Sequence, residues 1–302
     1  MWGMAGWTGS DDAESRRALD LAVERGCNFF DTAYAYGDGK SEQLLRDALA
    51  RHRGRRLYAA TKVPPKNRRW PGRADTPIAE VFPYEYVMGM TNESRHNLGV
   101  DRIDLQQLHV WSDAWVADDG WKRAVEDLKR KGIIEGFGIS VNRWEPANVL
   151  AALDTGLVDS VQVVYNIFDQ APEDLLFPAC QRLGVAVIAR VPFDEGSLTG
   201  TMTVDDTWPQ GDWRSLYFTP DNLRQTLDRV DRVRPLVPEG GSLPDLALRF
   251  ILHHPAVSTT IPGMRRVRHV EANLAAGQAP LLAAEAIAAL RAHRWDRDWS
   301  IP

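Results

Sequence analysis

The chain has 302 residues, of which 44% are hydrophobic and 25% charged, proportions that are typical of a globular protein and exclude disordered, collagen-like and coiled-coil chains. Lysine and arginine number 36 against 41 aspartates and glutamates, so the net charge is −5. This mildly acidic balance argues against bulk binding to nucleic acid or to an anionic membrane surface. No basic segment precedes an apolar one at the start, and no eighteen apolar residues run together. We therefore expect a cytoplasmic protein without a membrane span.

Short β-rich runs alternate with amphipathic segments along the chain, which is the pattern of repeated βα units. Strands are predicted at 27–31, 57–62, 103–109, 133–140, 160–164, 185–190 and 257–261. Helices are predicted at 13–25, 42–51, 83–98, 121–131, 146–153, 173–183, 222–236, 243–253 and 267–276. Ser41, Thr219 and Ser242 are the expected N-caps of three of these helices.

Seven or eight such units, with no linker and no shift in composition, predict one domain over residues 1–302 with the fold of a (β/α)8 barrel, a TIM barrel, whose usual length is roughly 250 residues plus insertions. A doubly wound parallel sheet is the alternative. Two insertions, near 64–83 and 192–220, follow predicted strands. We expect both to lie at the C-terminal mouth of the barrel, where barrels bind their substrates.

Tryptophan and cysteine give two further expectations. Four of the eleven tryptophans, Trp70, Trp111, Trp208 and Trp213, lie in segments predicted to form the mouth. They suggest an apolar or aromatic substrate pocket, and the alternative is that they pack the long loops together. The only cysteines, Cys27 and Cys180, lie far apart in apolar stretches, so we predict reduced thiols. No Cys/His cluster has metal-ligand spacing, and no metal site is predicted.

Three ionisable residues, Asp31, Lys62 and His109, each end a predicted strand, and Tyr36 follows Asp31 by five positions. Parallel strands of a barrel end at one mouth, so we expect the four side chains to share a pocket. A phenol, with a reference pKa of about 10, is too weak an acid to act near neutral pH unless a cation stabilises its anion. Lys62, anchored by Asp31, would stabilise the tyrosinate of Tyr36, and His109 would bond a carbonyl oxygen.

The segments around these residues resemble those of the aldo-keto reductase family. NFFDTAYAYGDGKSE is similar to the family's Asp/Tyr signature, AATKV to its lysine strand and DRIDLQQLHVW to its histidine strand. GFGIS, VQVVYN, ARVPFDEGSLTG and IPGMRRVRHVEAN follow in the order of its cofactor-binding segments. The resemblance implies a bacterial-type reductase of aldehydes and ketones on a barrel, with NADPH as the cofactor and a small carbonyl compound as the substrate.

The resemblance also implies a role for each matching position. Tyr36 would be the general acid, Lys62 and Asp31 its tuning pair, and His109 the residue that orients the carbonyl. Ser140 and Gln162 would hold the nicotinamide carboxamide, and Arg190 would stack on the nicotinamide ring. Backbone amides of the pyrophosphate loop would come from the segment that contains Pro192, Phe193, Gly196 and Leu198. The adenosine and its 2′-phosphate would contact Gly263, Met264, Arg265, His269 and Asn273.

Three departures from the family pattern accompany these matches. Val141 stands where many members have an asparagine, with Asn142 one position later, and Ala272 replaces a common glutamate that contacts adenine. Residues 1–7 resemble the turn after the family's first strand, so we expect an incomplete first strand and no hairpin on the barrel floor. Either the chain would start upstream, or the barrel would close by another route.

Two other functions fit the same residues. The protein could be a regulatory or interaction subunit that binds nicotinamide nucleotides with little turnover, or a barrel lyase or isomerase that forms a Schiff base on Lys62. The basic runs at 51–56 and 66–73 are expected to be solvated loops, with no nucleic-acid partner. Neither the physiological substrate nor the oligomeric state can be predicted from these residues.

Overall fold

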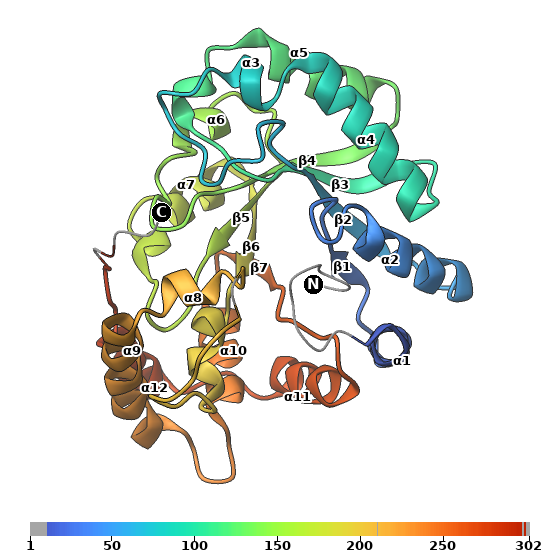
Figure 1. Ribbon diagram of the computed structural model, residues 1–302. Coiled ribbons are helices and arrows are strands. Elements are labelled where there is room, and N and C mark those ends of the chain that lie inside the picture. The colour runs from blue at the N-terminus through green and yellow to red at the C-terminus, as the bar shows by residue number, and fades with distance from the viewer. Residues whose placement is uncertain (1–10, 210, 298, 300–302) are drawn as a thin grey trace.

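The computed structural model describes residues 11–209, 211–297 and 299. Within them, seven parallel strands lie side by side in chain order and form a curled sheet with helices on its outer side (Figure 1). The strands are β1 (Phe29–Asp31), β2 (Tyr58–Val63), β3 (Ile103–Leu108), β4 (Ile134–Ser140), β5 (Ser160–Val164), β6 (Ala186–Arg190) and β7 (Val257–Thr260). The strand order never reverses, which excludes a doubly wound sheet. The predicted barrel fold is confirmed.

Helices connect successive strands and cover the outer side of the sheet (Figure 1). The longer ones are α1 (Asp12–Glu24), α2 (Lys40–Arg51), α4 (Tyr84–Leu98), α5 (Asp119–Arg130), α7 (Leu176–Leu183), α9 (Pro220–Val233), α10 (Leu243–His253), α11 (Val267–Gln278) and α12 (Ala284–Arg291). Single turns occur at α3 (Ile78–Val81), α6 (Leu150–Leu153), α8 (Arg214–Tyr217), η1 (Asp113–Trp115), η2 (Ala171–Glu173) and η4 (Arg234–Leu236), and a longer 3₁₀ segment at η3 (Asp194–Thr199). None of the helices in the described part of the chain is both long and apolar enough to cross a bilayer.

Two of the three predicted N-caps are confirmed. The side chains of Thr219 and Ser242 accept hydrogen bonds from the backbone N–H groups of the third residues of α9 and α10. Ser41 is not a cap: the N-cap of α2 is Gly39, at φ 89°, and the Ser41 hydroxyl accepts a hydrogen bond from Thr32 at 2.7 Å. A β-carbon at Gly39 would lie 2.5 Å from Nδ2 of Asn97, so only glycine fits there.

Helix α6 begins at Leu150 instead of at residue 146. Its first turn is capped by Asp113, whose carboxylate accepts hydrogen bonds from the amides of Ala151 (2.9 Å) and Ala152 (3.3 Å). The capping residue therefore comes from the loop after β3, where a local sequence pattern cannot reveal it.

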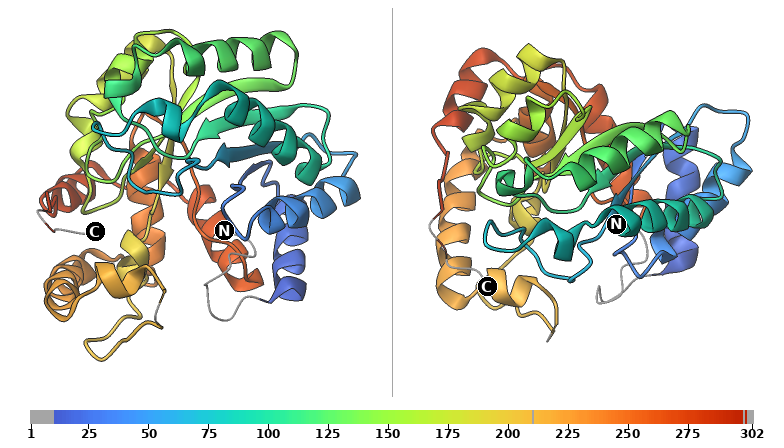
Figure 2. Two further views of the ribbon diagram at one scale, coloured as in Figure 1. Left: turned by 45° about the horizontal axis from the view of Figure 1, so that its top comes forward. Right: turned by 90° about the horizontal axis from the view of Figure 1, so that it is seen from above.

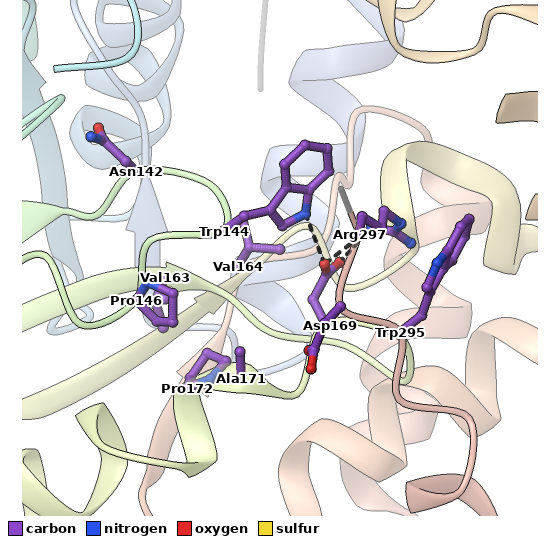
Figure 3. Close-up of a pocket in the computed structure, with 11 residues that line it drawn as sticks. Asn142, Trp144, Pro146, Val163, Val164, Asp169, Ala171, Pro172, Trp295 and Arg297 are labelled. Carbon is purple, nitrogen blue, oxygen red and sulfur yellow. Dashed lines mark hydrogen bonds and ion pairs between the residues drawn. The ribbon is translucent and has the colours of Figure 1, made fainter. Parts of the chain in front are cut away.

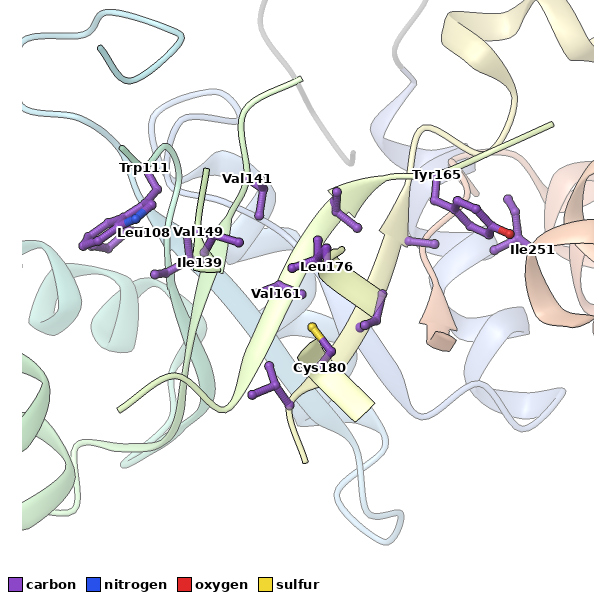
Figure 4. Packing of buried hydrophobic residues seen from close by; sticks show 14 of the residues in the cluster. Leu108, Trp111, Ile139, Val141, Val149, Val161, Tyr165, Leu176, Cys180 and Ile251 are labelled. Carbon is purple, nitrogen blue, oxygen red and sulfur yellow. The ribbon is translucent and has the colours of Figure 1, made fainter. Parts of the chain in front are cut away.

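The main core lies between the sheet and the helices. Figure 4 shows side chains such as Val161 of β5 and Leu176 and Cys180 of α7 packed in this layer. Trp111 belongs to it: the ring is fully buried and lies edge to face against Trp115 and Trp121, with centroids 5.9 and 5.0 Å away. For Trp111 the packing alternative, and not the substrate pocket, therefore agrees with the structure, because the ring packs outward against Trp115 and Trp121.

A second, small core fills the inside of the curled sheet. It consists of the buried residues Ala60, Leu105 and Ile188, with Phe29 packed against them. Side chains two positions apart on a strand face the same side, so this core lies one layer below Lys62 and the other inward-facing residues at the ends of the same strands. The core is the floor on which the candidate site rests.

The described strands leave an opening between β1 and β7, which are not hydrogen-bonded to each other. Helices α1 and α11 lie side by side across this opening (Figure 2), and the backbone amide of Val267 donates a hydrogen bond to Glu14 at 2.9 Å. The first-strand turn expected at residues 1–7 lies outside the described residues. Cys27 and Cys180 are free, as predicted.

Candidate active site

The four side chains predicted to share a pocket lie together at the C-terminal ends of β1, β2 and β3. Nζ of Lys62 donates hydrogen bonds to Oδ1 of Asp31 at 2.5 Å and to the carbonyl oxygen of Thr32 at 2.7 Å. The same nitrogen lies 5.3 Å from the centroid of the Tyr36 ring. The Tyr36 and His109 rings meet edge to face, with centroids 5.8 Å apart. A cation, a phenol and an imidazole therefore border one another.

Burial sets the charge states in this group. The Lys62 side chain is fully buried and that of Asp31 is 5% exposed, so each charge depends on the other for compensation. Burial lowers the pKa of His109 well below its ordinary value, and the nearby charges of Lys62 and Arg190 lower it further. The imidazole is therefore neutral near pH 7, and one of its nitrogens is a hydrogen-bond donor.

Two glutamines complete the surroundings of the Asp31 carboxylate. Nε2 of Gln107, on β3, donates to Oδ2 of Asp31 at 3.1 Å, and Nε2 of Gln162, on β5, donates to the same oxygen at 2.9 Å. Gln162 also donates to Oε1 of Gln107 at 3.2 Å. Gln162 matches a cofactor-binding position, whereas Gln107 is not among the predicted site residues. Its spacing of two residues before His109 on one strand was the signal that could have identified it.

The loop between β2 and α3 borders the mouth of the site. Trp70 on this loop is 43% exposed, and its ring lies edge to face against His109 at 5.8 Å. Farther along, the side-chain amide of Asn142 accepts a hydrogen bond from the amide of Gly72 at 3.2 Å and donates one to its carbonyl at 2.9 Å. Asn142 thus anchors this loop. Of the four tryptophans expected at the mouth, Trp70 is the one in contact with the candidate site.

The remaining mouth tryptophans, Trp208 and Trp213, pack elsewhere. Trp208 stacks on Phe218 with centroids 5.1 Å apart, and Trp213 packs against Tyr217 at 5.0 Å. Both therefore hold the segment between η3 and α9 together. For these two residues the packing alternative, and not the substrate pocket, agrees with the structure.

Three residues on neighbouring strands provide polar groups suited to a nicotinamide. Ser140 of β4 pairs in register with Gln162 of β5, and no described residue bonds Oε1 of Gln162. Arg190, at the end of β6, donates to the carbonyl of Val141 at 3.0 Å, and its buried Nε has no partner in the described structure. Burial, together with the charge of Arg143, lowers the pKa of Arg190 to about 10. These groups fit a carboxamide and an aromatic ring above it.

The loop after β6 differs from expectation in one respect. The backbone amides of Gly196 and Leu198 both donate to the carbonyl of Phe193, at 2.8 and 3.1 Å. In this conformation they cannot also donate to a pyrophosphate, because the loop closes on itself. Phe193 and Gly196 still lie in the loop after Pro192, whereas the Leu198 side chain is fully buried in the main core.

A network of buried charges surrounds this loop. Arg143 forms an ion pair with Glu195, whose carboxylate also accepts a hydrogen bond from Nε1 of Trp213 at 3.1 Å. Arg297 is fully buried: Nη1 donates to both oxygens of Asp169 at 3.0 Å, and Nη2 lies 2.8 Å from Oδ1 of Asp194. No local sequence pattern marks these pairs.

Figure 3 shows the Asp169–Arg297 pair beside a cavity of about 160 Å³. Trp144, whose indole nitrogen donates to Asp169 at 3.1 Å, and Trp295 also line this cavity. Arg297 lies six residues beyond the end of α12, so the segment after this helix is tied both to the loop after β5 and to η3.

The predicted adenosine segment lies between β7 and the first turns of α11. Gly263, Met264 and Arg265 precede the helix, His269 is in its first turn, and Nδ2 of Asn273 donates to the carbonyl of Gly263 at 3.4 Å. Burial lowers the pKa of Arg265, as do the charges of Arg266 and Arg214. Burial and three arginines likewise lower the pKa of His269. Cations crowd one another here, and such a site favours an anion.

Comparisons with known proteins agree with this arrangement. The family model described as "Aldo/keto reductase family" matches residues 1–294. Pyridoxal 4-dehydrogenase of Microbacterium luteolum is 29% identical over an alignment 296 positions long, which covers 87% of this chain and 83% of that protein. NADH-specific methylglyoxal reductase of Escherichia coli is 26% identical over an alignment 289 positions long, which covers 91% of this chain and 87% of that protein.

Solved structures with the same fold cover nearly the whole chain. Aldo-keto reductase AKR11C1 from Bacillus halodurans, in its holo form, has a TM-score of 0.75 and 29% sequence identity. The match covers 96% of this chain and 90% of the AKR11C1 chain. The glycerol dehydrogenase AKR11B4 from Gluconobacter oxydans has a TM-score of 0.78 and 26% identity, with 97% and 89% covered. With a family match over residues 1–294, the chain belongs to the aldo/keto reductase family.

Proposed function

We propose that this protein reduces aldehydes or ketones to alcohols, reversibly, with NADPH as the hydride donor. The observation that carries the proposal is the position of the Lys62 ammonium, which is held by Asp31 and lies 5.3 Å from the centroid of the Tyr36 ring. A buried cation beside a phenol is the arrangement that makes the phenol a useful acid. The relatives named as reductases and dehydrogenases of small carbonyl compounds and alcohols support the same reaction class.

Four residues of the chain then have defined tasks. The hydroxyl of Tyr36 gives its proton to the carbonyl oxygen of the substrate, and the ammonium of Lys62 stabilises the phenolate that forms. Asp31 keeps the ammonium charged and in place. The neutral imidazole of His109 donates a hydrogen bond to the same carbonyl oxygen and so fixes its position. The bound dinucleotide supplies the hydride.

Ser140, Gln162 and Arg190 would hold the nicotinamide. Both N–H groups of Gln162 are taken, by Asp31 and by Gln107, so its Oε1 is the end left for the N–H of a carboxamide. The guanidinium plane of Arg190 would lie on the ring.

NADPH is proposed over NADH because arginines gather where the 2′-phosphate would lie. A guanidinium forms a charge-assisted fork with a phosphate. The test is the ratio of the NADH and NADPH dissociation constants, measured for the parent and for Arg265→Ala. We expect the substitution to weaken NADPH binding selectively, and an unchanged ratio contradicts the assignment.

The decisive experiment on the reaction is Tyr36→Phe, with Tyr34→Phe in the same loop as the matched control. Tyr36→Phe should abolish the reduction of an aromatic aldehyde while the dissociation constant for NADPH stays nearly the same. Tyr34→Phe should retain turnover, because the Tyr34 ring lies beside Arg68 at 6.0 Å, and its one link to Lys62, a backbone hydrogen bond of 3.4 Å, is unchanged by the substitution. Equal turnover by Tyr36→Phe and the parent would refute the proposal.

The Schiff-base alternative disagrees with the structure. The Lys62 ammonium is fully buried and donates to a carboxylate and to a backbone carbonyl, so no lone pair is available to attack a substrate. The free thiols of Cys27 and Cys180 agree with a role in the reducing cytoplasm, where we place the protein.

A further inference from the structure

We propose that Gln107 is a positioning residue for the reaction, acting through the carboxylate of Asp31; this inference rests on the proposed function. Gln107 is fully buried, and its Nε2 lies 3.1 Å from Oδ2 of Asp31. Lys62 bonds the other carboxylate oxygen, Oδ1. The carboxylate is thus held at both ends, by a cation on one oxygen and by amides on the other.

The orientation of the two amides follows from their partners. An ionised carboxylate only accepts hydrogen bonds, so Gln107 and Gln162 must both turn Nε2 towards Asp31. Oε1 of Gln107 then accepts the second N–H of Gln162 at 3.2 Å. Gln107 therefore fixes both the aspartate that anchors the lysine and the glutamine proposed to hold the carboxamide. It touches neither the reacting atoms nor the proposed nicotinamide position.

The neighbouring strands leave room for this side chain. Gln107 pairs in register with Lys62 on β2 and with Gly138 on β4. A β-carbon at Gly138 would lie 3.0 Å from Cγ of Gln107 and 2.4 Å from Oγ of Ser160. Glycine at this position leaves space for the Gln107 side chain to extend towards Asp31.

Removal of the Gln107 amide has a predictable electrostatic effect. The Asp31 carboxylate loses one of the donors that share its negative charge, so it attracts the Lys62 proton more strongly. A more fully neutralised ammonium stabilises the Tyr36 phenolate less. The pH at which the tyrosine and lysine pair titrates in the rate profile should therefore rise.

The chain offers a matched control in the adjacent residue. Gln106 is 1% exposed, so it is buried like Gln107, but it points to the opposite face of β3, and neither of its polar side-chain atoms has a hydrogen-bond partner among the described residues. Gln107→Met and Gln106→Met each remove one side-chain amide and keep a similar side-chain volume. Only the first removes a contact with Asp31.

The experiment measures kcat against pH and the NADPH dissociation constant for the parent and both variants. We expect Gln107→Met to lower kcat about tenfold, because misplacement of a supporting group costs rate. In the plot of kcat against pH, the limb assigned to the Tyr36 and Lys62 pair should move to higher pH. The NADPH dissociation constant should change less than about threefold, because the dinucleotide keeps its other contacts. Gln106→Met should match the parent in all three quantities.

The outcomes separate this inference from the proposed function. A parent enzyme that reduces no member of a carbonyl panel refutes the proposed function. A parent that turns over, with Gln107→Met equal to Gln106→Met in kcat and in pH limb, refutes the positioning role alone. Gln107→Asn keeps an amide, but its side chain is too short to reach Asp31, so it should show the same shift in the plot of kcat against pH. This variant tests the inference if Gln107→Met does not fold.

Discussion

The buried ion pairs of Arg297 allow a quantitative prediction for Arg297→Met. The guanidinium compensates two carboxylates at once, those of Asp169 and Asp194, and the side chains of Arg297 and Asp194 are both fully buried. In the variant, Asp194 keeps hydrogen bonds from Tyr217 at 3.0 Å and Ser197 at 2.7 Å, but it loses its cation. Two negative charges then remain close together without solvent.

Removing one partner of a buried ion pair costs about 3–5 kcal/mol, because a charge is left without compensation. The cost must depend on pH. Burial raises the pKa of Asp194, and Arg297 is the main group that opposes this rise. In the variant the folded-state pKa is still higher above the unfolded value of about 3.9. The variant therefore keeps its stability below the unfolded pKa and loses it as the pH rises through the folded-state pKa of Asp194. The difference in unfolding free energy between the parent and the variant should widen towards about pH 8.

The assay is urea unfolding, followed by tryptophan fluorescence, at about pH 5 and about pH 8. Arg294→Met is the control, because Arg294 forms its ion pairs with Asp174 and Asp296 at the surface, where such pairs contribute about 0–1 kcal/mol. Arg297→Met should lose several times more stability than Arg294→Met, and more at the higher pH. Equal losses, or a loss that does not change with pH, would refute the reasoning.

Three more predictions concern other parts of the molecule. The His109 imidazole should stay neutral from about pH 8 down to about pH 6, so its ring resonances should not titrate there by NMR; a midpoint in that range contradicts the assignment. Trp70→Ala should lower kcat/KM for aromatic aldehydes roughly two- to tenfold, the value of one aromatic contact, whereas Trp208→Ala should not. Burial raises the pKa of Glu42, so its contribution to stability is present below about pH 4.3 and lost as the pH rises through the folded-state pKa. Glu42→Gln should remove this decline, about 1.4 kcal/mol for each unit of the rise, when urea midpoints are compared across that range.

The parts of the fold that depend on local pattern were predictable. All seven strands appear within two residues of their predicted bounds, because a buried parallel strand is a short apolar run between turn residues. The convergence of Asp31, Lys62 and His109 was also predictable, because each lies within one residue of the end of a strand and parallel strands share one open end. Topology alone brought these residues together.

Details that depend on a neighbour distant in sequence were not predictable. Ser41 has the right residue type for an N-cap, but the N-cap of α2 is Gly39, where the side chain of Asn97 leaves no room for a β-carbon. Trp111 follows the histidine strand, but its ring turns towards Trp121 and away from the mouth. In both cases a side chain from another unit of the barrel decides the outcome.

Gln107 and Arg297 show this limit at the site itself. Each is one of several residues of its type. The spacing of Gln107 from His109 places it on the inner face of β3, but nothing in the sequence near Gln107 or Arg297 shows that either side chain reaches a buried carboxylate. The difference lies in what each faces: Gln107 and Arg297 reach buried carboxylates, whereas Gln106 faces the helix layer and Arg294 reaches carboxylates at the surface. A buried carboxylate requires a compensating hydrogen-bond donor or cation, and that group can come from any part of the chain. The burial of Asp31 and Asp194, once known, is therefore what turns an ordinary glutamine and an ordinary arginine into residues on which the site depends.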